Sequence, residues 1–143
     1  MIAIDKDDAQ EPSRPATRKR ARRWLTGFWL LLVALTHFPN PYPHRSEPQH
    51  FDKVVHFSLY AALAVLALRS LTLAARWASP IARCTGIFAA VVAFGLFDEA
   101  TQPITGRDFD WFDWLADGLG ALAGVACYEM FRRRVGRAKR VPP

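Results

Sequence analysis

Four apolar segments, separated by shorter polar stretches, dominate the pattern of hydrophobic and polar positions along the chain. They cover residues 24–38, 54–75, 81–97 and 111–131. An α-helix needs roughly 20 predominantly apolar residues to cross a bilayer, and the first segment is short of that length. The pattern therefore predicts an all-α protein, a membrane-embedded bundle of four helices.

The two ends of the chain are polar and rich in Arg and Lys. We expect residues 1–23, which end in RKRARR, to form a disordered cytoplasmic arm, and residues 132–143 to form a basic cytoplasmic tail. Residues 24–131 are then the membrane domain. A signal peptide is the alternative for the first apolar segment, but the long polar lead and the lack of a small-residue cleavage site in THFPNPYP favour a retained anchor.

Basic residues alternate between the connections of the apolar segments. The N-terminal arm, the C-terminal tail and the connection with Arg69, Arg76 and Arg83 are basic, whereas the connections at 39–53 and 98–110 carry few Lys and Arg. Because an excess of Lys and Arg marks the cytoplasmic side, both termini are predicted to be cytoplasmic. The net charge of +6 comes largely from the two ends, so we expect membrane lipids as partners and no nucleic acid.

Two polar sequences flank the apolar segments on the side opposite the termini. In FDKVVHFSLY, the residues Asp52, His56 and Tyr60 are spaced i, i+4, i+8 and share one face of a helix. In FDEATQPITGRDFDWFD, the residues Glu99 and Gln102 are i, i+3 neighbours. With the predicted topology, the two sequences meet at the extracytoplasmic face.

The fourth apolar segment carries its polar and small residues on a single face. Asp113, Asp117, Gly120 and Gly124 follow the spacing i, i+4, i+7, i+11. A carboxylate that faced lipid toward the helix centre would cost about 2.5–3.5 kcal/mol, so Asp117 should face the bundle interior. The two glycines allow a neighbouring helix to approach closely. This face is therefore predicted to pack against another helix.

Some charges stand where the helix dipole disfavours them. Glu99 closes the third segment and Lys53 opens the second, and each mismatch costs about 0.3–1 kcal/mol. These positions are explained if Lys53, Arg107 and His56 face the acids of the third and fourth segments. Departures from local preference of this kind indicate a site.

The motifs DKVVHF and FDEATQPITGRDFDWFDWLADGLGALAG resemble the VanZ-like family of small bacterial membrane proteins. The family pattern has Asp-Lys-x-x-His-Phe, then Glu-x-x-Gln, an Arg, and an Asp leading to Leu-Ala-Asn-x-x-Gly. The family usually has Asn where this chain has Asp117. The resemblance implies a multi-pass protein of the bacterial cytoplasmic membrane, and the founding member is associated with resistance to the glycopeptide teicoplanin. The matching positions are Asp52, Lys53, His56, Glu99, Gln102, Arg107, Asp110, Asp113, Gly120 and Gly124.

Three functions remain open. In the first, the outward-facing residues bind an anionic group of an envelope lipid or cell-wall precursor, with Arg107 as a bidentate donor and Lys53 as a point charge, oriented by Glu99 and Asp113. In the second, the protein is a hydrolase or transferase at the outer leaflet, with His56, Glu99 and Asp113 as catalytic candidates. In the third, the charges form an ion-pair network that fixes the bundle.

The predicted site is a set of binding residues without a cofactor. The acids and His56 include enough donors for a divalent metal, but no stretch has the spacing of a known metal motif, so we expect neither a metal nor another cofactor. Transport would require several copies, so an oligomer stays possible. The predicted binding residues are Asp52, Lys53, His56, Glu99, Gln102, Arg107, Asp110, Asp113 and Asp117, and the predicted packing residues are Gly120 and Gly124.

Overall fold

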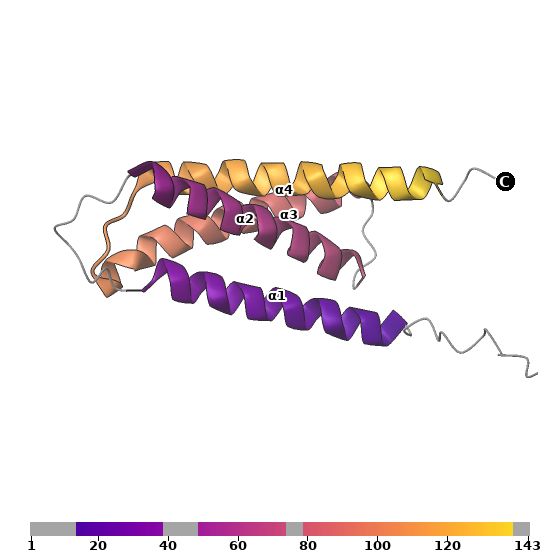
Figure 1. Ribbon diagram of the computed structural model, residues 1–143, viewed down its shortest axis with the longest axis horizontal. Helices are drawn as coiled ribbons and strands as arrows, with labels where there is room; N and C mark the ends of the chain where they lie inside the picture. Colours follow the sequence, from indigo (N-terminus) through magenta and orange to yellow (C-terminus); the bar gives the residue numbers. More distant parts are fainter. Residues whose placement is uncertain (1–13, 39–48, 74–78, 139–143) are drawn as a thin grey trace, which may run out of the picture.

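The computed structural model describes residues 14–38, 49–73 and 79–138. In these ranges the chain forms four α-helices and one short 3-10 helix and no strand, which confirms the all-α prediction. The helices are α1 (Arg14–Thr36), α2 (Gln49–Thr72), α3 (Pro80–Thr101) and α4 (Trp111–Ala138), and the 3-10 helix η1 (Gln102–Thr105) directly follows α3 (Figure 1).

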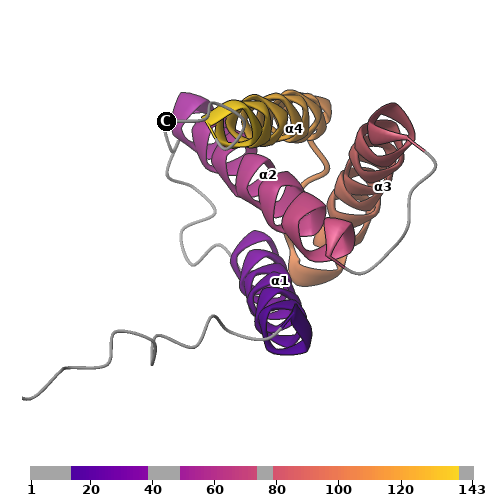
Figure 2. The same ribbon diagram turned by 90° about the vertical axis from the view of Figure 1, so that its right-hand side faces the viewer.

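The helices run along the long axis of the molecule and alternate in direction (Figure 1). We call the end where α1 begins and α4 ends the terminal end, and the end that holds η1 and the start of α4 the loop end. Viewed along the bundle, α2 lies between α1 and α4, and it contacts each of the other three helices (Figure 2). α2 is therefore the central helix of the bundle.

The structure corrects the predicted disorder of the N-terminal arm. Residues 14–23 are helical and form the first turns of α1, which begins ten residues before the predicted start at Trp24. Arg, Lys and Ala are strong helix formers, and Pro15 stands in the first turn, where its missing N–H is tolerated. Residues 1–13, the rest of that arm, lie outside the described residues. At the other end, α4 continues past the predicted boundary at Phe131 to Ala138.

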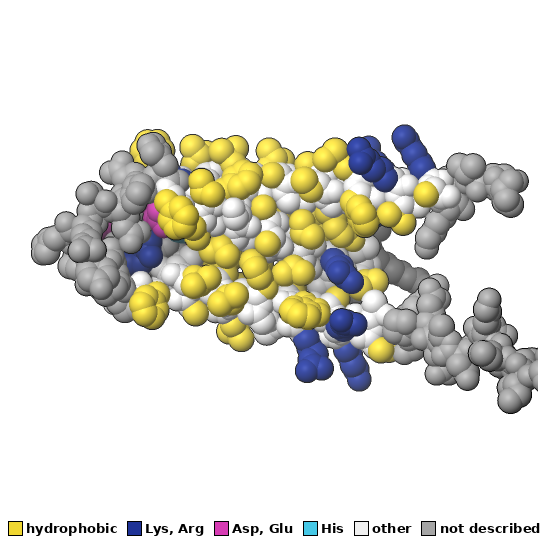
Figure 3. Space-filling model, viewed as in Figure 1, with side chains coloured by type: hydrophobic (Ala, Val, Ile, Leu, Met, Phe, Trp, Pro, Cys, Tyr) yellow, Lys and Arg dark blue, Asp and Glu magenta, His cyan; other side chains and the backbone are white. Residues whose placement is uncertain are grey.

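Two stretches of the described chain are long and apolar enough to cross a membrane, Phe51–Thr72 in α2 and Pro80–Thr105 in α3 and η1. α1 begins with basic residues, and α4 carries Asp113 and Asp117 in its first two turns. Large apolar side chains nevertheless cover the outside of all four helices, and basic side chains gather at the terminal end (Figure 3). An exposed apolar surface of this extent indicates a membrane protein.

A close contact between α2 and α4 depends on two glycines. A Cβ atom at Gly120 would lie 2.2 Å from the backbone oxygen of Phe57, and one at Gly124 would lie 2.3 Å from that of Ala61. No side chain fits into these spaces, so the two backbones touch at both positions. The contact sets the glycine face of α4 against α2 and fixes which side chains of the two helices meet.

Candidate functional site

The loop end is shaped by the turn between α3 and α4. η1 ends at Gly106, whose φ of 79° lies in the left-handed region that favours glycine. Asp110 then caps α4, because its Oδ1 accepts a hydrogen bond of 2.8 Å from the backbone N–H of Phe112. The end of α3 and the start of α4 thus come to lie at the same end of the bundle as the start of α2 (Figure 1).

Lys53 joins α2 to the start of α4. Its Nζ donates hydrogen bonds of 2.9 Å to Asp110 Oδ2 and 3.0 Å to Asp113 Oδ1, and it lies 5.9 Å from the centre of the Phe112 ring. Burial alone would raise the pKa of Asp110, but the hydrogen bonds from Lys53 and from the Phe112 N–H outweigh this effect and lower the pKa. Asp110 is therefore a carboxylate that holds the Lys53 ammonium in place.

His56 is the centre of a buried polar group. Its Nδ1 lies 3.0 Å from Asp117 Oδ1 and 3.6 Å from Glu99 Oε1. Glu99 also accepts hydrogen bonds from Gln102 Nε2 at 2.8 Å and from the backbone N–H of Asp110 at 3.2 Å. We call His56, Glu99, Gln102 and Asp117 the inner cluster; each of them is at most 2% exposed.

Arg107 lies at the edge of the site, and its partner differs from the one that the sequence predicted. We expected it to face the acids of the third and fourth segments, but its Nη2 contacts Asp52 Oδ2 of α2 at 3.5 Å. This distance is too long for a strong hydrogen bond, and the two side chains are 24% and 36% exposed. Arg107 follows Gly106 in a turn, so helical periodicity could not predict its direction.

The predicted binding residues thus lie at the loop end in two layers. The residues of the inner cluster come from α2, α3, α4 and η1. Buried Asp113 accepts the hydrogen bond from Lys53 and has a carboxylate oxygen within 4.8 Å of a ring nitrogen of His56. Glu99 was expected to orient the cations, but in the structure it binds Gln102 and the Asp110 N–H instead. We call the partly exposed outer layer the rim; it consists of Asp52, Lys53, Arg107 and Asp110.

A family model described as VanZ/LLP1 matches residues 7–132. The match includes both polar sequences that form the loop end. The chain belongs to the VanZ/LLP1 family. This result confirms the resemblance that the DKVVHF motif and the 97–124 sequence indicated. No curated protein and no solved structure matches the chain.

In this VanZ/LLP1 protein α1 also contributes polar residues to the loop end, which the sequence did not predict. Thr36 Oγ1 donates a hydrogen bond of 3.1 Å to Asp98 Oδ1, and His37 Nε2 lies 2.9 Å from Thr101 Oγ1. Asp98 is buried, so these contacts attach α1 to α3 inside the bundle. The available signal was the pair Thr36 and His37 at the end of an apolar segment, on the same side as Asp98.

Among the unpaired buried groups at the loop end of the VanZ/LLP1 bundle, two carboxylate oxygens, Asp98 Oδ2 and Asp117 Oδ2, stand against one hydroxyl, that of Tyr60, in the described part of the chain. A Cβ atom at Gly95 would lie 3.0 Å from Asp117 Oδ2 and 3.1 Å from Tyr60 Cε1, so Gly95 leaves room for both side chains. A buried acceptor without a donor costs about 1–3 kcal/mol. The interior at the loop end therefore holds more acceptors than donors.

The surplus of acceptors includes groups that suit a metal ion. His56, Glu99 and Asp117 each offer one donor atom, and these atoms lie within 4.8 Å of one another. Asp52, His56 and Asp113 form a second such group. Imidazole nitrogen and carboxylate oxygen are ligands of Zn²⁺ and related divalent ions. Since the three members of the buried group come from α2, α3 and α4, no spacing within the sequence shows them together.

Proposed function

We propose that this protein is a multi-pass protein of the bacterial cytoplasmic membrane whose loop end faces away from the cytoplasm and binds an anionic group of an envelope lipid or cell-wall precursor. Membership of the VanZ/LLP1 family, two sufficiently apolar helices and the apolar outer surface support the membrane location. The basic terminal end supports the orientation, because Lys and Arg accumulate on the cytoplasmic side.

The remaining donors of Lys53 and Arg107 carry this proposal. An ammonium group has three N–H donors, and Lys53 directs two hydrogen bonds at Asp110 and Asp113. A guanidinium has five, and among the described residues Arg107 makes one long contact, with Asp52. Both side chains are partly exposed, so their other donors can meet a phosphate or carboxylate that arrives from outside.

The resemblance to the VanZ-like family extends the proposal to glycopeptides. The founding member is associated with teicoplanin resistance, and a protein that binds a cell-wall precursor would change how much precursor a glycopeptide can reach. Expression of the wild-type protein should then alter teicoplanin susceptibility, and Arg107→Lys should abolish that change.

The direct test is thermal stabilisation of the purified, detergent-solubilised protein by a polyprenyl phosphate and by a lipid-linked cell-wall precursor. We expect the ligand to raise the melting temperature of the wild type. Arg107→Lys should weaken the apparent affinity about tenfold or more, because an ammonium cannot replace the bidentate guanidinium. Arg133→Lys, a change of an exposed arginine at the terminal end, is the matched control and should respond as the wild type does.

Two outcomes would contradict binding at the loop end. The first is an equal response of the wild type and Arg107→Lys to both compounds. The second is a loss of Arg107→Lys protein from the membrane without any ligand effect, which would favour an ion-pair network that only stabilises the bundle.

A second candidate is a hydrolase or transferase at the outer leaflet, in which His56, Glu99 and Asp117 would hold a divalent metal or His56 would act as general base beside the carboxylates. The buried group of donor atoms within 4.8 Å and the surplus of carboxylates favour it. In that case the precursor is converted to product, and both His56→Gln and a chelator stop the conversion. Binding alone instead gives stabilisation without product.

A further inference from the structure

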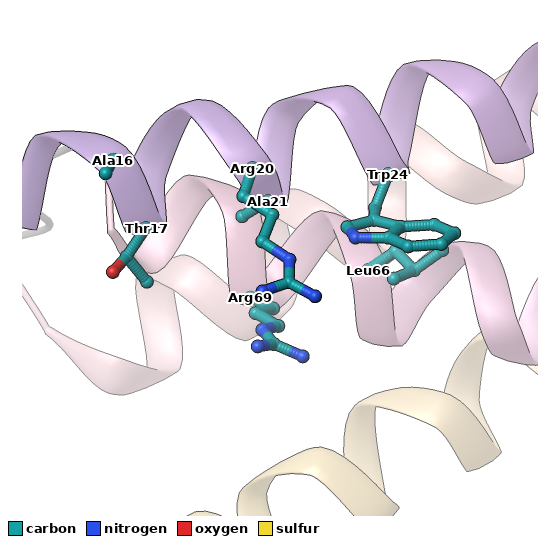
Figure 4. A pocket seen from close by; sticks show the side chains of 7 residues that line it. All are labelled: Ala16, Thr17, Arg20, Ala21, Trp24, Leu66 and Arg69. Carbon is teal, nitrogen blue, oxygen red and sulfur yellow. The ribbon is translucent and has the colours of Figure 1, made fainter. Parts of the chain in front are cut away.

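A groove of about 620 Å³ lies between α1 and α2 toward the terminal end, away from the rim and the inner cluster (Figure 4). The first turns of α1 form one wall and the last turns of α2 form the other. The small side chain of Ala21, which is buried, also lines the groove. None of the residues assigned to the loop-end site lines it.

Two arginines from different helices extend into this groove. Figure 4 shows the guanidinium groups of Arg20, on α1, and Arg69, on α2, near each other between the two helices. No ion pair or hydrogen bond joins either side chain to the described residues. Two cations at close range repel each other, and an anion between them attracts both and outweighs this repulsion. Guanidinium groups match the geometry of phosphate oxygens, which makes a phosphate the fitting anion.

The groove becomes apolar toward the bundle centre. Trp24 stands four residues after Arg20 on α1, and Leu66 stands three residues before Arg69 on α2. Each helix therefore places an apolar side chain about 4.5–6 Å deeper than its arginine at a rise of ~1.5 Å per residue, and Trp24 lies beside Leu66 (Figure 4). A phospholipid presents the same order, a charged phosphate at the interface followed by acyl chains.

The surroundings of the groove are positively charged. Basic side chains gather at the terminal end on both α1 and α4 (Figure 3). Such a basic end attracts anionic lipids of the cytoplasmic leaflet. The basic residues near the groove are Arg18, Lys19, Arg22 and Arg23 on α1, and those of α4 are Arg132, Arg133, Arg134 and Arg137.

We propose that this groove binds one anionic phospholipid, with the phosphate between Arg20 and Arg69 and the upper acyl chain against Trp24 and Leu66. A soluble phosphate would leave the apolar wall unused, so a lipid is the occupant. The site goes beyond the function proposed for the loop end and uses none of its residues, so Arg107→Lys should leave binding in the groove unchanged.

The test compares phosphatidylglycerol, phosphatidylcholine and inorganic phosphate as additions to the purified full-length chain in a neutral detergent. Binding is followed by native mass spectrometry and by the melting temperature. We expect phosphatidylglycerol to bind and stabilise the wild type, and Arg20→Gln/Arg69→Gln to reduce its affinity about tenfold or more. The matched control, Arg22→Gln/Arg134→Gln, removes the same charge from exposed residues outside the groove and should keep the wild-type affinity.

The melting temperature without lipid shows whether the double variant loses lipid only because its fold is damaged. Without lipid, Arg20→Gln/Arg69→Gln should melt at the wild-type temperature or above it, because it removes a repulsion. A lower melting temperature would show that the two arginines already have a partner within the protein, such as the acidic residues of the 1–13 segment, and would overturn the proposal.

Three other results would also overturn it. If the matched control lost as much phosphatidylglycerol affinity as the groove variant, the binding would depend only on the overall charge of the terminal end. Equal binding of phosphatidylcholine would remove the role of the arginines in choosing an anionic headgroup. Full stabilisation by inorganic phosphate would show a site for a soluble anion.

Discussion

Lys53 carries a positive charge near the start of α2, where the helix dipole makes it unfavourable by about 0.3–1 kcal/mol. Two hydrogen bonds to carboxylates, Asp110 and Asp113, offset this cost, since a hydrogen bond to a charged group contributes about 1.5–3 kcal/mol. Asp113 is buried and depends on Lys53 for its charged partner. A residue that breaks a local rule is thus explained by contacts with a distant part of the chain.

Asp117 has one paired and one unpaired oxygen, and this difference leads to a prediction. Oδ1 lies 3.0 Å from His56 Nδ1, whereas Oδ2, packed over Gly95, has no donor in the described residues. Asp117→Asn would keep the first oxygen and place an amide donor where the second stands. VanZ-like sequences usually have Asn at this position. We expect Asp117→Asn to raise the melting temperature of the detergent-solubilised protein, because the amide keeps the oxygen beside His56 and removes the cost of burying a negative charge.

The control is Asp117→Ala, which removes the acceptor for His56 and leaves a cavity, and which should lower the melting temperature. A fall of equal size in Asp117→Asn and Asp117→Ala would contradict the expectation. It would mean that the negative charge itself stabilises the protein, as it would beside a bound cation.

Three pairs of helices are joined by different kinds of contact. Glycines bring α2 against α4, the Thr36–Asp98 hydrogen bond attaches α1 to α3, and an ion pair between Arg83 and Glu129 joins α3 to α4 toward the terminal end. Arg83 is buried, although its sequence position suggested a basic connection at the membrane surface. The helices are therefore fixed at both ends of the bundle by polar contacts and in between by close packing.

The glycine contact predicts a large difference between two changes in the same helix. Gly120→Ala would place a Cβ atom 2.2 Å from the Phe57 oxygen, so α2 and α4 must move apart, at a cost of about 1–3 kcal/mol or more. Gly118→Ala would place its Cβ atom 4.0 Å from a Val92 methyl group, an ordinary contact, and would improve helix propensity by about 0.8–1 kcal/mol. We expect a lower melting temperature for Gly120→Ala and an equal or higher one for Gly118→Ala.

Similar melting temperatures for the two alanine variants would show that α2 and α4 do not pack as closely as described. The loop-end site provides a second readout. Because Gly120 stands three residues after Asp117, a shift of α4 should also weaken the response to the polyprenyl phosphate, whereas Gly118→Ala should leave that response intact.

The bundle as a whole is asymmetric along its axis. Among the described residues, most of the basic ones lie at the terminal end, and every acid except Glu129 lies at the loop end together with the inner cluster. Apolar side chains cover the surface between the two ends (Figure 3). The orientation proposed above rests on this distribution, because Lys and Arg accumulate on the cytoplasmic side. The loop-end and groove proposals then refer to opposite faces of the membrane.

Reporter fusions test this orientation. A fusion after Gly106, in the turn between η1 and α4, should be active as a periplasmic or extracellular reporter, and a fusion after Pro143 should be active as a cytoplasmic reporter. Neutralising the basic residues among 18–23 should weaken the preference of the chain for this orientation in the membrane. A cytoplasmic signal from the fusion at Gly106 would contradict the proposed topology and remove an outward-facing rim.

The sequence by itself determined the number and approximate positions of the helices, the side of the bundle on which the acids gather and the face of α4 that packs. Apolar runs and the spacing of Asp113, Asp117, Gly120 and Gly124 are local properties, so they can be read along the chain. The helical start of α1 was missed because the same basic residues suit a solvated coil and a helix that extends beyond the apolar segment.

Tertiary structure alone decided which side chains meet and how deeply they are buried. Arg107 pairs with Asp52, Asp98 binds Thr36, and Arg20 faces Arg69 only because of the rotation and tilt of whole helices. Those rotations follow from backbone contacts such as that of Gly120 with Phe57, which join residues far apart in the chain. A periodic pattern fixes the polar face of one helix, whereas the partner of that face depends on the packing of all four helices.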